Sequence, residues 1–297
     1  MSSSIQAARA PRATPVQALD PAWHLHAIGA QVAWSLGLRG DGVRIGLVDG
    51  GVDLEHPELS GAVASGRIQV HRISPGQAPI PDHGTAVASL LVGDNQGLAR
   101  EATLVVADVY RMGRHRRVSR AEPEDVRAGL KWLLEHGQVD LVLMTLERRG
   151  QDAWIRDLVQ EAERSGILVV ASIGNGGRQG ETGSPGNYPE ALGVGSLDRG
   201  GEPGPESPEG LLCWEDRRSV KPELLAPGSG VRVALCPRRY GWERGTSFAA
   251  PLVAGSAALL LQHSPKLGVA GLRERLGSGA LDLARSFSVS SSAPAVA

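Results

Sequence analysis

Five short apolar segments, separated by longer amphipathic stretches, are the feature of this sequence that most restricts its fold. They are VRIGLVD (43–49), TLVVADV (103–109), VDLVLMT (139–145), ILVVASI (167–173) and LGVGSL (192–197). Each is rich in Val, Leu and Ile and lacks the apolar–polar alternation of a half-solvated strand. We therefore predict five strands that are buried on both faces, as in a parallel sheet.

Two of the intervening stretches have helical periodicity and helix end signals. Residues 121–137 (AEPEDVRAGLKWLLEHG) place Pro123 near the start and Gly137 at the stop. Residues 151–166 (QDAWIRDLVQEAERSG) repeat this design, with Trp154 on the apolar face. Alternating strands and helices predict an α/β fold, a three-layer, doubly wound sheet flanked by helices.

The composition fits a globular chain with a sizeable core. Hydrophobic residues make up 41% and charged residues 21% of the 297 residues. We expect one large α/β domain over residues 21–285. Residues 1–20 are small, polar and punctuated by proline, and they are predicted to be a flexible leader. Residues 286–297 are of low complexity and are predicted to be a disordered tail.

Charge and hydropathy argue against several kinds of partner. The formal net charge of −1 gives no reason to expect nucleic acid or an anionic membrane. The N-terminal residues lack the apolar core of a secretory signal, and no apolar run is long enough to span a bilayer. We expect a cytoplasmic protein with no nucleic-acid or membrane partner.

Two cysteines, Cys213 and Cys236, are too few for a disulfide framework. We expect two partly buried thiols, and a single bridge between them stays open. No Cys/His cluster has zinc-ligand spacing, so no cofactor is expected.

Three distant segments supply the residue types of a serine hydrolase: VDGGVD around Asp49, DHGTAVAS around His83 and GTSFAAP around Ser247. Ser247 begins an apolar helix that is expected to run to about His263. The free N–H groups at such a helix start favour a developing anion. The alternative is that Ser247 is only a helix cap.

His83 also begins an apolar helix, where it can act as a general base if a carboxylate orients its ring. Asp49 ends a buried strand and is otherwise a costly unpaired charge, so it is the preferred partner. Asp53 and Asp82 are nearby competitors, but the side chain of Asp82 should diverge from that of its neighbour His83.

Asn175 lies in ASIGNGG, directly after an apolar segment. Its amide N–H can stabilise an oxyanion, as an asparagine does in subtilisin, or Asn175 can simply hold a left-handed turn. The order Asp, His, Asn, Ser predicts nucleophilic acyl transfer and favours peptide hydrolysis. A Rossmann-type nucleotide site is disfavoured, because the first turn reads VDGGVD rather than G-x-G-x-x-G.

With these motifs the sequence resembles the subtilisin-like serine proteases (subtilases) over about residues 21–280. The resemblance extends to SPGNYP, PELLAPG and GTSFAAPLVAG. It implies a mainly parallel sheet of about seven strands. It also implies that Asp49 orients the base His83, that Ser247 is the nucleophile and that Asn175 is the oxyanion donor. The substrate-binding positions that it implies are Thr145, Leu146, Glu147, Gly174 and Gly183.

The sequence departs from the family pattern at two places near the site. Ala86 replaces the second histidine of the usual HGTH motif. Thr145, Leu146 and Glu147 stand where the family usually has Ser-Leu-Gly, so a carboxylate replaces a glycine beside the specificity pocket. Glu147 either favours a basic residue at the cleaved position or turns outward to pair with Arg148 or Arg149.

Two further segments bear on partners and metals. The arginine-rich RMGRHRRVSR (111–120) should border the cleft, where it either recruits an acidic peptide or partner or is a solvated loop. The loop that binds calcium in many subtilases is trimmed in GDNQGLAREATL (93–104), so we expect no obligatory metal.

Only 48 residues precede Asp49, and most of them match the mature domain of the family. We expect the chain to fold unaided and to be restrained by narrow specificity, a partner or a loop. The predicted function is an intracellular serine endopeptidase that processes a protein or peptide. Its expected partners are that substrate and an activating or inhibiting protein. The alternative function is a latent or inactive subtilase fold that acts as a peptide- or protein-binding module.

Overall fold

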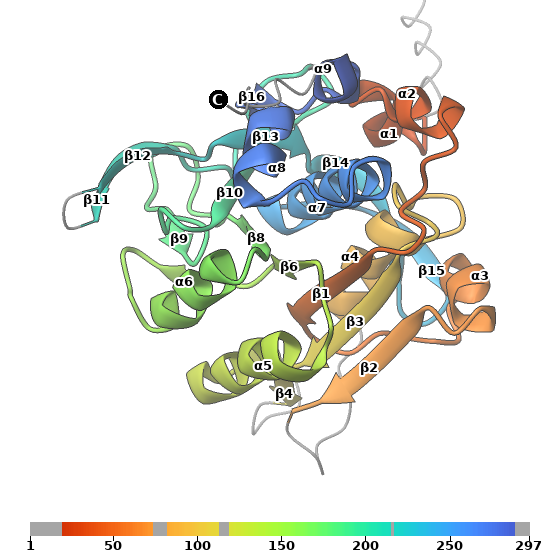
Figure 1. Cartoon of the computed structure of the whole chain (residues 1–297), viewed down its shortest axis with the longest axis horizontal. Coiled ribbons are helices and arrows are strands. Elements are labelled where there is room, and N and C mark those ends of the chain that lie inside the picture. Colours follow the sequence, from red (N-terminus) through yellow and green to blue (C-terminus); the bar gives the residue numbers. More distant parts are fainter. Residues whose placement is uncertain (1–19, 74–81, 113–118, 215–216, 289–297) are drawn as a thin grey trace, which may run out of the picture.

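The computed structural model describes residues 20–73, 82–112, 119–214 and 217–288. Its centre is one eight-stranded sheet in which every neighbouring pair of strands is parallel (Figure 1). In spatial order the strands are β16 (Gly279–Ala280), β13 (Leu224–Pro227), β10 (Leu192–Leu197), β8 (Leu168–Ser172), β6 (Leu141–Met144), β1 (Arg44–Asp49), β3 (Thr103–Asp108) and β2 (Ile68–Arg72).

The five strands predicted from apolar segments are confirmed as β1, β3, β6, β8 and β10, and they are contiguous in the sheet. Their residues are buried along nearly the whole of each strand, which explains the absence of a polar alternation. The sheet has eight strands rather than seven. Its edge strand β16 is only two residues long, too short to leave an apolar run in the sequence.

Helices cover both faces of this sheet, which confirms the three-layer prediction (Figure 1). Residues of α4 and α7 belong to the larger apolar core on one face, and residues of α5 and α6 to the core on the other. The helices are α1 (Trp23–Ala27), α2 (Ala30–Ser35), α3 (Ser60–Ala64), α4 (Asp82–Val92), α5 (Pro123–His136), α6 (Arg156–Arg164), α7 (Thr246–His263), α8 (Val269–Leu276) and α9 (Leu283–Ser288), with a 3₁₀ turn η1 at Pro57–Leu59.

Helix ends follow the sequence signals closely in α5 and less closely in α6. Pro123 is the first residue of α5 and Gly137 is its C-terminal cap. The predicted helix over 151–166 is shorter, because α6 begins only at Arg156. Trp154 therefore lies in the preceding turn rather than on the helix, and it lines a pocket beside the sheet.

Helix α7 runs through the middle of the molecule and is buried continuously from Thr246 to Leu260. It is apolar on all sides, as a fully enclosed helix must be. Pro251 lies inside its second turn. This rigid helix fixes the position of Ser247 at its N-terminal end.

Outside this sheet, the described residues form four antiparallel pairs of strands. They are β4 (Tyr110–Met112) with β5 (Ser119–Ala121), β7 (Arg148–Arg149) with β9 (Gly183–Ser184), β11 (Gly210–Trp214) with β12 (Arg217–Lys221), and β14 (Ser229–Leu235) with β15 (Arg239–Arg244). The β4–β5 pair shows that both ends of the arginine-rich segment are extended. Residues 113–118 lie outside the described part of the chain.

Two expectations about termini and cysteines are modified. Helix α9 continues three residues past the expected domain boundary at 285. The leader up to residue 19 and the tail from residue 289 lie outside the described residues. Cys213 and Cys236 are both free, and Cys213 is exposed rather than partly buried.

Candidate active site

The candidate site lies at the carboxyl ends of β1, β6 and β8, where ligand chemistry gathers in open parallel sheets. Asp49 is the last residue of β1 and is completely buried, and His83 is the second residue of α4. Nδ1 of His83 lies 2.9 Å from each carboxylate oxygen of Asp49. The structure thus selects Asp49 over its competitors as the carboxylate that orients the histidine ring.

Close backbone contact makes this pairing possible. A Cβ atom on Gly84 would lie 2.4 Å from the carbonyl oxygen of Gly51 and 2.5 Å from that of Gly50. Because no side chain fits there, the glycine after His83 lets α4 begin directly against the end of β1.

Further donors hold the buried Asp49 carboxylate. The N–H of Gly50 donates to its Oδ1 at 2.5 Å, and the hydroxyl of Thr145 donates to its Oδ2. The sequence suggested Thr145 only as a substrate-binding residue. Its hydroxyl also anchors Asp49, a role that only the approach of β6 to β1 reveals.

The environment of His83 favours its protonated form. Burial opposes protonation, but the charge and hydrogen bond of Asp49, with a smaller contribution from Glu243, outweigh it and raise the pKa of His83 above 6.5. The imidazole side chain is 31% exposed, so its other ring nitrogen is available to a second partner.

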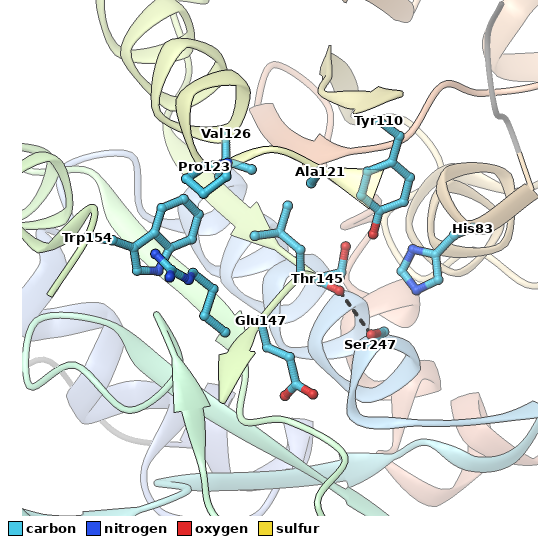
Figure 2. A pocket seen from close by; sticks show the side chains of 11 residues that line it. His83, Tyr110, Ala121, Pro123, Val126, Thr145, Glu147, Trp154 and Ser247 are labelled. Carbon is cyan, nitrogen blue, oxygen red and sulfur yellow. Dashed lines mark hydrogen bonds between the residues drawn. The ribbon is translucent and has the colours of Figure 1, made fainter. Parts of the chain in front are cut away.

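Ser247 is the second residue of α7, and it lines the same pocket as His83 (Figure 2). Its hydroxyl donates to the carbonyl oxygen of Thr145 at 3.0 Å rather than to His83. Its side chain does not cap the helix, because the N-cap residue is Gly245. Catalytic hydrogen bonds are often incomplete without substrate, and rotation about the Cα–Cβ bond of Ser247 redirects this hydroxyl.

Asn175 follows β8 and is exposed at the edge of this site. Its side-chain oxygen accepts the backbone N–H of Thr246 at 2.9 Å, which leaves the NH₂ end of the amide for another partner. Asn175 does not have a positive φ, so the left-handed alternative is wrong. That conformation belongs to Gly174, whose φ is 109°.

Thr246 ties the segment around Asn175 to the start of helix α7. Its hydroxyl donates to the carbonyl oxygen of Gly174 at 3.0 Å. The sequence analysis missed this residue. The pattern GTS, with a threonine directly before the serine, was the available signal.

The pocket itself has a volume of about 340 Å³. The residues predicted around the cleft that line it are Thr145, Leu146 and Glu147, together with His83 and Ser247. Gly174 and Gly183 contribute through their closeness to Glu147: a Cβ on either would lie within 3 Å of the carboxylate atom Oε2.

Glu147 does not pair with its arginine neighbours. Arg148 forms an ion pair with Asp152 at 3.0 Å, and its guanidinium lies over the ring of Trp154 at 5.4 Å. Among the described residues no basic group lies within 4 Å of the Glu147 carboxylate. The outward alternative is therefore wrong for Arg148 and Arg149.

No group of three or more His, Cys, Asp or Glu side chains is arranged to hold a metal ion in the described part of the chain.

In the segment 93–104, where the calcium loop of the family is expected to be trimmed, the carboxylate of Glu58 binds the turn. Buried Glu58 accepts the N–H groups of Asn95 and Gln96 at 2.7 and 2.6 Å. It also accepts the hydroxyl of Tyr240 at 2.8 Å.

At the other edge of the pocket, Arg111 forms an ion pair with Asp125 at the start of α5. This arginine of the 111–120 segment is thus held by the protein itself. Most of the other arginines in the segment lie outside the described residues.

A sequence profile described as the subtilase family matches residues 40–291, which is most of the chain. The chain belongs to the subtilase family. The match begins later and ends later than the resemblance over about 21–280.

Individual relatives agree with this membership. Subtilisin E of Bacillus subtilis (strain 168) is 29% identical over 263 residues, covering 88% of this chain and 66% of the relative. The major intracellular serine protease of the same strain is 28% identical over 248 residues, covering 80% of this chain and 73% of that protein. The chain thus spans about two thirds of the length of subtilisin E.

Solved structures show the same fold. A cold-adapted subtilisin-like serine proteinase aligns with a TM-score of 0.68 and 25% identity, covering 82% of this chain and 90% of that one. The prenylagaramide maturation protease PagA aligns with a TM-score of 0.66 and 26% identity, covering 80% and 81%. No described helix combines the length and apolar character needed to traverse a bilayer.

Proposed function

We propose that this subtilase is a serine endopeptidase that cleaves a protein or peptide through Ser247, His83 and Asp49. The observation that carries the proposal is the pairing of His83 Nδ1 with both oxygens of buried Asp49, at the mouth of a pocket that also contains Ser247. Few structural roles need a histidine held in this way beside a serine.

In the proposed reaction, His83 removes the proton of the Ser247 hydroxyl as the oxygen attacks the substrate carbonyl. Asp49 stays ionised and stabilises the imidazolium that forms. His83 then donates the proton to the departing amine, leaving an acyl-enzyme ester on Ser247. Water, activated by the same histidine, hydrolyses this ester.

The developing oxyanion is proposed to bind the NH₂ group of Asn175 and the backbone N–H at the start of α7. The bond from Thr246 to the Asn175 oxygen supports this role, because it fixes which end of the amide is free. A helix of 18 residues adds positive potential at its N-terminus.

We further propose that the enzyme acts inside the cell on one or a few substrates and is restrained by narrow specificity or a protein partner. The name of one relative, the major intracellular serine protease, supports the location, and that of the maturation protease PagA supports action on few substrates. Maturation of a peptide precursor would need only one cleavage site to be recognised.

A second candidate is a latent subtilase fold that binds peptides without cleaving them. It is favoured by the Ser247 hydroxyl, which donates to Thr145 rather than to His83. In that case the observed arrangement persists when a peptide binds.

A fluorophosphonate probe separates the two candidates. We expect it to label the wild type at Ser247, as located by mass spectrometry of the labelled peptide. Ser247→Ala should abolish labelling. Ser256→Ala is the matched control, because Ser256 lies in the same helix but donates to the carbonyl oxygen of Leu252. A folded wild type that resists the probe would overturn the endopeptidase proposal and support the binding module.

A further inference from the structure

We propose that Glu147 selects lysine or arginine as the substrate residue whose carbonyl carbon is attacked. This inference rests on the proposed function, and it names the substrate class of the same site.

The position comes from two glycines that leave room for the acid. A Cβ on Gly174 would lie 2.1 Å from Oε2 of Glu147, and one on Gly183 would lie 2.8 Å from the same atom. The carboxylate therefore lies in the space that side chains at these positions would fill. Figure 2 shows that Glu147 extends from the strand end at Thr145, in the pocket that also holds Ser247.

Its location identifies the substrate residue that it would meet. Oε1 of Glu147 lies 3.4 Å from the backbone nitrogen of Asn175, the residue whose side-chain NH₂ group is the proposed oxyanion donor. A carbonyl held at Asn175 belongs to the residue under attack, and that residue's side chain begins one bond away from the carbonyl carbon. A long side chain on this residue can therefore extend through the pocket toward Glu147.

Among the described residues, no basic side chain forms an ion pair with the Glu147 carboxylate. Its one hydrogen bond in the described structure is the long one from Asn175. Arg148, the adjacent residue, is committed to Asp152 and Trp154. Burial raises the pKa of Glu147, and the Asn175 N–H and the charge of Arg149 oppose this only in part. A half-buried anion of this kind gains most from an incoming ammonium or guanidinium group.

The same closeness affects the reaction step. An unneutralised carboxylate beside Asn175 repels the negative charge that develops on the substrate oxygen. A basic side chain on the substrate cancels this repulsion, whereas a neutral one leaves it in place. The preference should therefore appear in the rate of acylation as well as in binding.

Two small phosphonate probes test the inference without knowledge of the natural substrate. Both are diphenyl phosphonates that react with an active serine; one carries an arginine-like side chain and the other the uncharged, nearly isosteric citrulline-like side chain. We expect the wild type to react at least about tenfold faster with the basic probe, the effect of one charge-assisted hydrogen bond. Glu147→Gln should reduce this ratio to near one.

Glu181→Gln is the matched control, because Glu181 is an exposed carboxylate in the loop that precedes Gly183. It should keep the wild-type ratio. Labelling of Ser247 by the simple fluorophosphonate, with equal rates for the two diphenyl phosphonates, would overturn the inference and leave the proposed function intact. An equal loss of preference in Glu181→Gln would overturn the assignment to Glu147. Failure of Ser247 to react with any probe would instead overturn the proposed function.

Discussion

The carbonyl oxygen of Thr145 accepts the hydroxyl of Ser247 at 3.0 Å, while the hydroxyl of Thr145 donates to Asp49. A single residue at the end of β6 therefore contacts both ends of the proposed triad. Its backbone receives the serine and its side chain holds the carboxylate that orients His83. These two contacts can be separated by mutation.

Thr145→Val removes the hydroxyl but keeps the branched shape and the backbone carbonyl. We expect kcat to fall about tenfold, because a buried charged acceptor loses one hydrogen bond of about 1.5 kcal/mol, while KM stays near the wild-type value. Steady-state kinetics on a cleaved peptide provide the measurement. Thr103→Val is the control, because Thr103 is the first residue of β3 and the site lies at the carboxyl ends of the strands. A wild-type kcat in Thr145→Val would mean that this bond does not support the triad.

The pH dependence of kcat/KM should report the raised pKa of His83. The histidine acts as a base only when neutral, so activity is lost as the pH falls through its pKa. Because the pKa lies above 6.5, the acid limb should have its midpoint above pH 6.5. A limb centred at or below pH 6.5 would contradict the described environment.

The carboxylates of Asp49 and Glu243 both raise the pKa of His83, and replacing each of them should have a different effect on activity. Asp49→Asn should move the acid limb to lower pH and reduce kcat by about 10⁴, the effect known for this change in a serine-protease triad. Glu243→Gln removes a smaller contribution of the same sign. It should shift the limb less and retain most of kcat, as measured by the same pH series.

Glu58→Ala should destabilise the protein by about 3 kcal/mol, because it leaves buried donors on Asn95 and Gln96 without their acceptor. For a domain of this size the melting temperature should fall by about 6–12 °C. Differential scanning calorimetry provides the measurement. Glu55→Ala, which removes an exposed ion pair with Arg238, should change the melting temperature little.

Chelator should not reproduce the effect of Glu58→Ala. The turn over Asn95 and Gln96 is held by a carboxylate, so its stability needs no added cation. Removal of a metal ion that stabilises the native state would lower the melting temperature. We expect no such ion here, so EDTA should leave the melting temperature unchanged within about 1 °C. A large drop that calcium reverses would show that a cation contributes after all.

Gly174→Ala should have two separate effects: backbone strain should lower the stability, and displacement of the Glu147 carboxylate should lower the preference for the basic probe. Alanine at a φ of 109° costs about 1–2 kcal/mol. This cost should be similar in the wild type and in Glu147→Gly, because the carboxylate is the end of a flexible side chain that can swing away. The displaced carboxylate should, however, reduce the preference for the basic probe. A destabilisation that disappears in Glu147→Gly would indicate a rigid clash instead.

The sequence predicted those parts of the fold and site that depend on local patterns. Apolar runs without alternation identified five central strands, helix end signals located α5, and a long apolar run after Ser247 located α7. Asp49 and His83 stood out because each is followed directly by a glycine in a specific motif, and Ser247 because it lies two residues after Gly245 in GTSFAAP. The structure brings the first two together and places the third in the same pocket.

Features that depend on contacts across the sheet were not predictable in the same way. The role of Thr145 toward Asp49 arises because β6 pairs with β1, which no local pattern encodes. Trp154 has helical spacing, yet it lies in the turn before α6, where its backbone N–H donates to Oδ1 of Asp152 and Arg148 lies over its ring. The direction of Glu147 stayed open because both outcomes fit its sequence neighbours.

The crowding around Glu147 also limits how this protein can diverge. A side chain at Gly183 would meet not only the carboxylate but also the Cβ of Glu147, 2.9 Å away and fixed by the main chain. Mutation at residue 183 is therefore blocked while any β-carbon stands at 147. Descendants of this gene that acquire new substrates are therefore expected to change residue 147 first. Only afterwards can they place a larger side chain at residue 183.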